Sequence, residues 1–251
     1  MKIQKTTLPK DKLRQRLIRS SITGVIFFIL VITGFLMIRK GPKEDASPVV
    51  LRNNFKWNEK IGRFLYSNNN LAPEMPMPPP GKKPRVNGLI GLKSPIDEKY
   101  RIQVSSGEKE ISLSVAEIRA LPKSYAVIDF KCIEGWSEVF QYAGLSFNDF
   151  LNHFQVGKKP DGTYYKFVGF QTPDEEYYVS IDIESMLHPQ TILAYEMNSA
   201  ELAPNNGFPL RLMIPNKYGI KNLKRIGSIY FSDEQPPDYW AEQGYDWYAG
   251  L

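Results

Sequence analysis

The sequence predicts an α+β fold with mixed sheets, preceded by one transmembrane helix. Nineteen consecutive residues, Ser20 to Ile38, carry no charge, and they are apolar on every face of a helix. Beyond them, strand-length apolar runs outnumber helical patterns and do not alternate with helices as βαβ units would. The 14 Tyr and 14 Phe also favour strands over a helical bundle.

The net charge of +5 belongs to the N-terminal tail. Residues 1–19 hold seven Lys or Arg and one Asp, so the tail carries +6 and the remaining chain is close to neutral. The basicity therefore belongs to the tail, and a nucleic-acid partner of the main domain is excluded.

The uncharged run predicts a membrane anchor. As a helix it spans roughly 28 Å, close to the thickness of a bilayer core. A cleaved signal peptide is the alternative, but residues 35–39 offer no small-x-small cleavage site. We expect a basic cytoplasmic tail at 1–19, a transmembrane helix at 20–38, a linker at 39–52 and one domain at 53–251. The excess of Lys and Arg before the span places the N-terminus in the cytoplasm and the domain on the other side.

The main domain begins with a proline-rich stretch, residues 73–84, which predicts an extended arm lying on the domain. A capping box at Ser114–Glu117 predicts a short helix that ends before Pro122. A second helix is expected from Ser146, because Phe147, Phe150, Leu151 and Phe154 recur at helical spacing. The predicted strands are 100–104, 110–113, 125–132, 164–171, 177–183, 192–197, 210–214 and 226–231.

Cys132 is the only cysteine, so the chain has no internal disulfide. It stands at the end of a predicted strand, just before a turn that contains Gly135. Two interpretations are open: a small buried hydrophobe, which is the common role of a lone cysteine, or a thiolate that projects into a pocket.

Other catalytic and metal templates fit poorly. The two histidines, His153 and His188, and the single cysteine cannot form a zinc cluster at the usual spacings. A Cys–His nucleophile pair is possible, but no spacing supports it. Residues 205–225 combine a Gly-containing loop with Arg211, Lys221, Lys224 and Arg225, which suits a phosphate group or a solvated basic face.

Four motifs together resemble the sulfite-oxidase-fold molybdopterin oxidoreductases. They are Cys-Ile-Glu-Gly-Trp-Ser at 132–137, Leu-Ala-Tyr-Glu-Met-Asn at 193–198, Asn-Gly-Phe-Pro-Leu-Arg at 206–211, and the run from Pro215 to Lys224. Within this family the chain is most similar to the catalytic subunits of protein-methionine-sulfoxide reductases. The resemblance covers residues 50–251 and implies a sulfite-oxidase-type molybdopterin-binding domain.

The resemblance also implies a set of site residues. Cys132 would be the catalytic thiolate ligand of molybdenum, beside the dithiolene of a single pyranopterin. The pterin and its phosphate would be held by Asn53, Thr172, Asn206, Arg211 and Lys224, with Asn222 and Leu223 contributing backbone. Lys56 and Trp57 would be cofactor-binding by position, although the reductases have a Tyr-Glu pair there.

The implied reaction is oxygen-atom transfer, the reduction of free or protein-bound sulfoxides such as methionine sulfoxide. The implied electron donor is a haem- or quinol-linked membrane protein, and the implied location is the periplasmic side of the inner membrane. The N-terminus departs from the family because Arg14-Gln-Arg16 is not a twin-arginine pair. Sulfite oxidation, another S- or N-oxide substrate, and a non-enzymatic tethered binding module are the alternatives.

Overall fold

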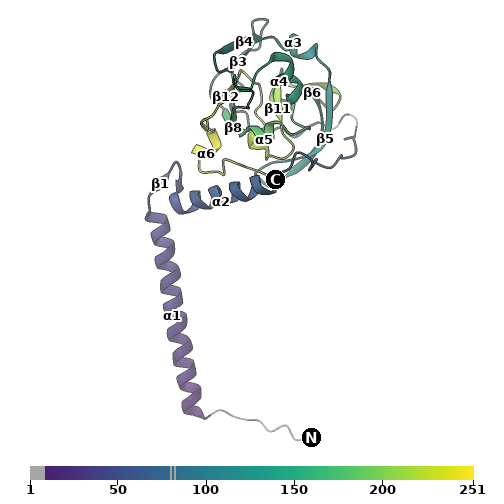
Figure 1. Cartoon of the computed structure of the whole chain (residues 1–251). Coiled ribbons are helices and arrows are strands. Elements are labelled where there is room, and N and C mark those ends of the chain that lie inside the picture. The colour runs from purple at the N-terminus through teal and green to yellow at the C-terminus, as the bar shows by residue number, and fades with distance from the viewer. Residues whose placement is uncertain (1–8, 80, 82) are drawn as a thin grey trace. The chain divides into compact units, whose positions relative to one another are not determined.

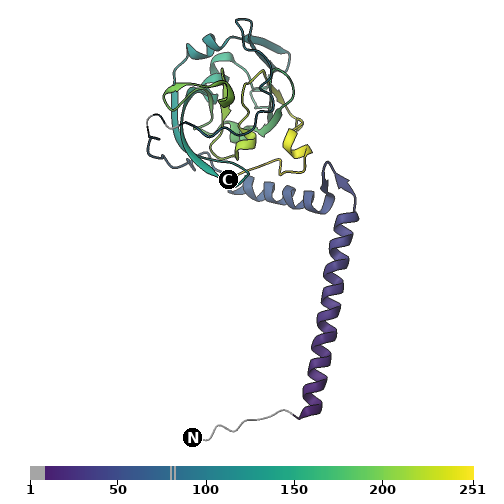
Figure 2. The same cartoon turned by 180° about the vertical axis from the view of Figure 1, so that it is seen from behind.

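The computed structural model describes residues 9–79, 81 and 83–251, which divide into two compact units that meet after Asn53. The first unit contains one long unbroken helix, α1 (Lys10–Lys40), seen in both views (Figures 1 and 2). No residue of α1 is buried, and within the described chain it alone is long and apolar enough to cross a membrane. The predicted span of 20–38 lies inside it.

A short hairpin and a second helix follow α1. Strands β1 (Lys43–Glu44) and β2 (Ser47–Pro48) pair antiparallel, and α2 (Val49–Leu65) begins directly after Pro48. Proline suits the entry of a helix because its φ is already helical and its missing N–H needs no partner there. The helix therefore begins within the stretch predicted as a linker.

The second unit is built around two five-stranded sheets, as the α+β prediction with mixed sheets requires. The first has the order β10-β9-β6-β5 with β11 also paired to β9: β5 (Ser124–Lys131), β6 (Ser137–Ser146), β9 (Ile192–Met197), β10 (Ala200–Glu201) and β11 (Arg211–Met213). The second has the order β4-β3-β12-β7-β8: β3 (Ile102–Ser106), β4 (Lys109–Leu113), β7 (Phe167–Gln171), β8 (Tyr178–Asp182) and β12 (Ser228–Ser232). It is mixed because β12 pairs parallel with β3 and antiparallel with β7.

The helices of this unit are short: α3 (Val115–Arg119), α4 (Phe147–Phe154), α5 (Ile183–Met186), α6 (Tyr239–Glu242), and the 3-10 turns η1 (Pro204–Asn206) and η2 (Gly219–Lys221). The capping box that opens α3 is present, with Ser114 and Glu117 each bonding the other's backbone N–H. The apolar face predicted for α4 is also confirmed, since Phe147, Phe150 and Leu151 are buried.

The two faces of the first sheet meet different surroundings. Side chains alternate along a strand, so neighbours point to opposite faces. In β9, Leu193 and Tyr195 belong to the main core, which the two sheets and α4 share, whereas Ile192 and Ala194 belong to a smaller cluster with Phe140 and Tyr142. The register of β9 against β6 shifts between Ala143 and Gly144, and this irregularity brings Met197 to the smaller cluster as well. Phe140, Tyr142 and Met197 also line a cavity of the second unit, so the first sheet forms one wall of that cavity.

Candidate functional site

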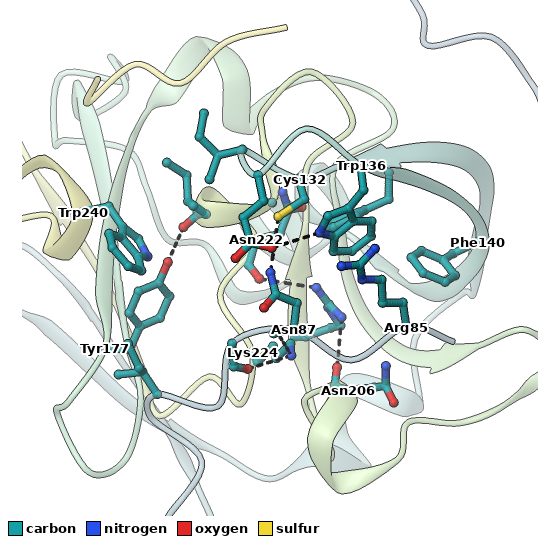
Figure 3. A pocket seen from close by; sticks show the side chains of 18 of the residues that line it. Arg85, Asn87, Cys132, Trp136, Phe140, Tyr177, Asn206, Asn222, Lys224 and Trp240 are labelled. Carbon is teal, nitrogen blue, oxygen red and sulfur yellow. Dashed lines mark hydrogen bonds between the residues drawn. The ribbon is translucent and has the colours of Figure 1, made fainter. Parts of the chain in front are cut away.

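A cavity of about 340 Å³ opens beside the first sheet, in the second unit. Four stretches far apart in sequence contribute its walls: residues 85–90 after the proline-rich arm, the turn between β5 and β6, the loops from 206 to 224, and residues 240–245 near the C-terminus. Figure 3 shows the labelled side chains converging on this space from different elements.

Cys132 lies in the wall of the cavity, directly after β5. Its backbone N–H donates to the carbonyl of Trp136 at 2.9 Å, and the N–H of Gly135 donates back to the Cys132 carbonyl at 3.0 Å. Gly135 has φ +87°, which allows this tight turn between β5 and β6. The Asn87 side-chain amide donates to Sγ at 3.4 Å, so the sulfur already has a donor facing it from the cavity wall (Figure 3).

Two cations stand close together at another part of the cavity. Arg211 at the start of β11 and Lys224 form an antiparallel bridge, which places both side chains on the cavity wall. The Arg211 guanidinium donates to the Asn206 carbonyl at 3.0 Å and lies over the Tyr142 ring at 5.2 Å. Its Nε is buried and has no hydrogen-bond partner within the described chain. A buried donor without a partner is costly, so this nitrogen is suited to an acceptor on a ligand.

Lys224 is held by backbone carbonyls. Its Nζ donates to the carbonyls of Asn87 at 2.5 Å, Gly88 at 2.9 Å and Asn205 at 2.9 Å. Burial, together with the neighbouring positive charge of Arg211, lowers the pKa of Lys224 to about 7, while Cys132 acts in the opposite direction. An anion bound between the two cations would favour the charged lysine and raise that pKa.

The lowered pKa of Lys224 predicts a pH dependence of stability for the cofactor-free protein. Between pH 7 and the ordinary value of 10.5, the unfolded chain binds more protons than the folded chain. The free energy of unfolding therefore rises with pH across this window. We expect the melting temperature of Lys224→Met, relative to wild type, to fall by a few degrees as the pH rises from about 6 to about 9. Parallel melting profiles for the two proteins over this range would contradict the assignment.

Gly207 lies between the two cations. It has φ +105°, and a Cβ there would stand 3.1 Å from the Cβ atoms of both Arg211 and Lys224. Gly207→Ala is expected to cost about 1–3 kcal/mol of stability through backbone strain and to reduce cofactor content by displacing both cations. Gly162→Ala is the matched control, because its φ is +83° but nothing lies within 4 Å of the added atom. Thermal melts and molybdenum content should separate the two: equal molybdenum in both variants would contradict a binding role for this corner.

Aromatic side chains line much of the rest of the cavity. The Arg85 guanidinium lies 4.5 Å from the centre of the Trp136 ring. Figure 3 shows the two side chains next to each other. Trp240 and Tyr245 contact each other at 5.1 Å between ring centres. The Tyr177 hydroxyl donates to the Ile220 carbonyl at 2.5 Å, and burial is the main cause of the raised pKa of Tyr177. Tyr177 therefore keeps its proton at neutral pH and holds η2 in place.

The structure brings five of the ten residues predicted for the site to this cavity: Cys132, Asn206, Arg211, Asn222 and Lys224. The other five do not line it. Asn53, Lys56 and Trp57 are exposed residues of α2, and Asn53 belongs to the first unit. Thr172 is buried and donates to Asp174 at 2.7 Å, and Leu223 is packed in the main core. A cofactor-binding role for these five stays a prediction.

Other residues singled out in the sequence have structural surroundings. Lys221 is buried against Asp238 at 2.5 Å, and the Arg225 guanidinium donates to carbonyls of residues 92, 94 and 208, so neither lines the cavity. His153 lies on α4 and His188 contacts the Asn70 carbonyl at 3.2 Å. Among the residues that the structure describes, no group of three His, Cys, Asp or Glu side chains is placed to hold a metal ion.

Most other lining residues were absent from the predicted site, among them Arg85, Asn87, Tyr177, Trp240 and Tyr245. Arg85 and Asn87 follow closely after the proline-rich arm. The arm was the one feature of the sequence that could have indicated them, because an extended segment lying on a domain can place side chains in a groove. Tyr177 begins a predicted strand and reads as an ordinary core aromatic. Trp240 and Tyr245 come from the C-terminal turn, where no local pattern indicates a site.

Comparison with known proteins agrees with the geometry. The model of the oxidoreductase molybdopterin binding domain matches residues 91–240. A protein-methionine-sulfoxide reductase subunit of Azospira oryzae, named YedZ1, is 34% identical over 203 residues, 78% of this chain and 74% of that protein. The protein-methionine-sulfoxide reductase catalytic subunit MsrP of Campylobacter jejuni is 32% identical over 174 residues, 61% of this chain and 57% of its own length.

Among solved structures, the sulfane dehydrogenase SoxCD of Paracoccus pantotrophus matches 55% of this chain and 39% of its own, with a TM-score of 0.49 and 18% identity. The family match covers more than half of the chain, and most of the Azospira protein's length is matched. The chain therefore belongs to the oxidoreductases with a molybdopterin binding domain, as its motifs predict.

Proposed function

We propose that the chain is the membrane-anchored catalytic subunit of a reductase that removes oxygen from sulfoxides such as methionine sulfoxide. Cys132 would be its thiolate ligand to molybdenum, and the cofactor would carry a single pyranopterin. One observation carries the proposal: Cys132 and the two cations Arg211 and Lys224 line the same cavity, which has a volume of about 340 Å³.

The residues present fit such a group. A deprotonated cysteine sulfur is a soft donor that suits a heavy metal, and the Asn87 amide already donates to it at 3.4 Å. The unpartnered Nε of Arg211 can donate to an anion, and the missing side chain of Gly207 leaves room between Arg211 and Lys224. An Arg fork beside a lysine ammonium is a suitable cradle for a phosphate.

When bound, the molybdenum pterin supplies two-electron chemistry with oxygen-atom transfer, and the protein supplies position and surroundings. Asn87 would hold Sγ in position through its side-chain amide. Arg211 and Lys224 balance the negative charge of the phosphate, and the Asn222 side chain accepts from the Ile214 N–H at 2.6 Å, which fixes the loop that leads to Lys224. The aromatic side chains in the walls lower the local polarity, which strengthens each of these electrostatic contacts.

The substrate class rests on the relatives and on the character of the walls. The Azospira and Campylobacter proteins are both named for protein methionine sulfoxide. Trp136, Trp240 and Tyr245 offer rings to a thioether side chain, and sulfur makes favourable contacts with aromatic edges. These features favour a methionine sulfoxide over a small inorganic anion.

Arg85 supports a second candidate, oxidation of sulfite or reduction of another S- or N-oxide. Its guanidinium lines the same cavity and adds a third cation beside Arg211 and Lys224. To decide, the purified holoenzyme is assayed with methionine sulfoxide, free and in an oxidised protein, and with sulfite. We expect turnover of the sulfoxides with a reduced dye as donor. Sulfite oxidation without sulfoxide reduction would contradict the leading proposal.

For the cell, we propose a single-pass protein of the inner membrane with a cytoplasmic N-terminus and a periplasmic domain. The support is the exposed apolar helix α1 and the basic residues before it. The domain limits of 1–19, 20–38, 39–52 and 53–251 belong to the same proposal. The relatives are named as subunits, which supports a membrane partner that delivers electrons, haem- or quinol-linked.

A further inference from the structure

The part of helix α2 that belongs to the second unit has two faces with opposite surroundings, and one of them packs on the rest of that unit. Gly62 lies against the ring of Tyr248, so that a Cβ at Gly62 would stand 2.7 Å from a ring carbon. Arg63 pairs with Glu184 at 3.0 Å, and its guanidinium lies 5.9 Å from the centre of the Trp247 ring. The C-terminal half of α2 is therefore fixed to the domain.

The other face of α2 is apolar and exposed. Trp57 is 63% exposed, Ile61 54%, Phe64 87% and Leu65 66%. Residues three and four apart share one side of a helix, so these four form a continuous stripe, which we call the α2 stripe. Soluble domains seldom leave so many large apolar side chains together in water, and such patches mark contact with a membrane or a partner.

Basic residues flank the α2 stripe. The Nζ of Lys60 lies 5.1 Å from the centre of the Trp57 ring, and Lys56 is exposed one residue before that tryptophan. Long lysine side chains keep their apolar stems along a hydrophobic surface while the ammonium reaches polar headgroups. Tryptophan is enriched at the same depth, the boundary between hydrocarbon and water.

The chain itself holds the start of α2 near a bilayer. Only residues 41–48 separate α1 from α2, and within them Lys43 pairs with Pro48, so the connection folds back instead of extending. A helix that begins so soon after an apolar span begins near the membrane surface. An amphipathic helix with a basic margin in this position suits the interface of an anionic membrane.

We propose that the α2 stripe inserts into the headgroup region of the bilayer, with Lys56 and Lys60 directed to anionic headgroups. The occupant is lipid and not a second copy or a protein groove, because the stripe is one helix wide, is bordered by lysines, and follows the candidate span within a few residues. The contact fixes the catalytic domain to the membrane surface through the packing of Gly62 and Arg63. This inference does not depend on the substrate or the cofactor.

Depth-dependent fluorescence quenching of the full chain tests the inference. The protein is reconstituted into vesicles of phosphatidylcholine and phosphatidylglycerol, with and without bromine on the acyl chains. The signal of Trp57 is the difference between wild type and Trp57→Phe, which separates it from the other three tryptophans. We expect brominated lipid to remove most of this component and ordinary lipid to shift it to the blue.

Two variants complete the test. Ile61→Glu with Phe64→Glu is expected to abolish the quenching of Trp57, because it places two charges in the stripe. Tyr125→Glu, a similar change at another exposed aromatic residue on β5, is expected to leave the quenching unchanged. A Trp57 component that brominated lipid does not quench would overturn the proposal. If chemical cross-links then joined two α2 helices, the stripe would belong to a second copy instead.

Discussion

Cys132→Ser is expected to reduce the turnover of sulfoxides by at least about 100-fold, while the protein still folds. The change replaces a soft thiolate with a hydroxyl that is a poor ligand for a heavy metal at neutral pH, and outer-shell changes alone commonly cost 10–100-fold in metal sites. Molybdenum content should fall as well, because a bond between protein and metal is lost. Sulfoxide reduction, metal analysis and a thermal melt measure the three effects.

The fold is expected to survive because Cys132 belongs to none of the apolar clusters of the core and the turn around it is held by backbone hydrogen bonds. Ser137→Ala, at the exposed start of β6, is the control and should behave as wild type. Wild-type turnover in Cys132→Ser would contradict the assignment of the Cys132 sulfur as the ligand to molybdenum. It would also revive the interpretation of a merely buried cysteine.

Arg211→Met is expected to reduce the retention of the cofactor by roughly 10- to 100-fold. Hydrogen bonds to a charged group contribute about 1.5–3 kcal/mol, and each 1.4 kcal/mol corresponds to a factor of ten. Methionine keeps much of the volume beside Tyr142 but removes the donors. Cofactor retention in Arg211→Lys should fall between that of wild type and that of Arg211→Met, because a point charge cannot reproduce a planar guanidinium fork.

The measurement is the amount of pterin and molybdenum that stays with the protein after gel filtration. Arg119→Met is the control, since Arg119 makes an exposed ion pair with Glu201 and does not line the cavity. Equal retention in Arg211→Met and Arg119→Met would show that the unpartnered Nε of Arg211 serves no ligand.

Local patterns in the sequence predicted the elements that carry their own signals. The capping box of Ser114 and Glu117, the apolar face of α4 and the strand that leads to Cys132 all depend on neighbouring residues, and the structure contains them, with β5 ending one residue before Cys132. Strand β6 was missed because Glu138, Gln141 and Gly144 interrupt its apolar pattern, and its pairing with β5 and β9 decides its conformation. Tertiary pairing often overrides a weak strand pattern in this way.

The residues of the candidate site fall into the same two groups, those that belong to a local sequence pattern and those that do not. Cys132, Arg211 and Lys224 could be chosen because they belong to motifs, whereas Arg85 and Trp240 reach the cavity only through the path of the whole chain. The apolar stripe of α2 was also missed, because Asn53, Lys56 and Trp57 were interpreted by their positions in the family. Their exposure on a helix that follows a candidate membrane span becomes visible only in three dimensions.

The central claim is that the sulfur of Cys132 is bonded to molybdenum. X-ray absorption at the molybdenum edge, on holoenzyme prepared in a host that makes the cofactor, tests it most directly. The account predicts about one molybdenum per chain and one fewer sulfur neighbour of the metal in the metal-retaining fraction of Cys132→Ser than in wild type. No molybdenum in the wild-type protein, or the same sulfur neighbours in both proteins, would contradict it.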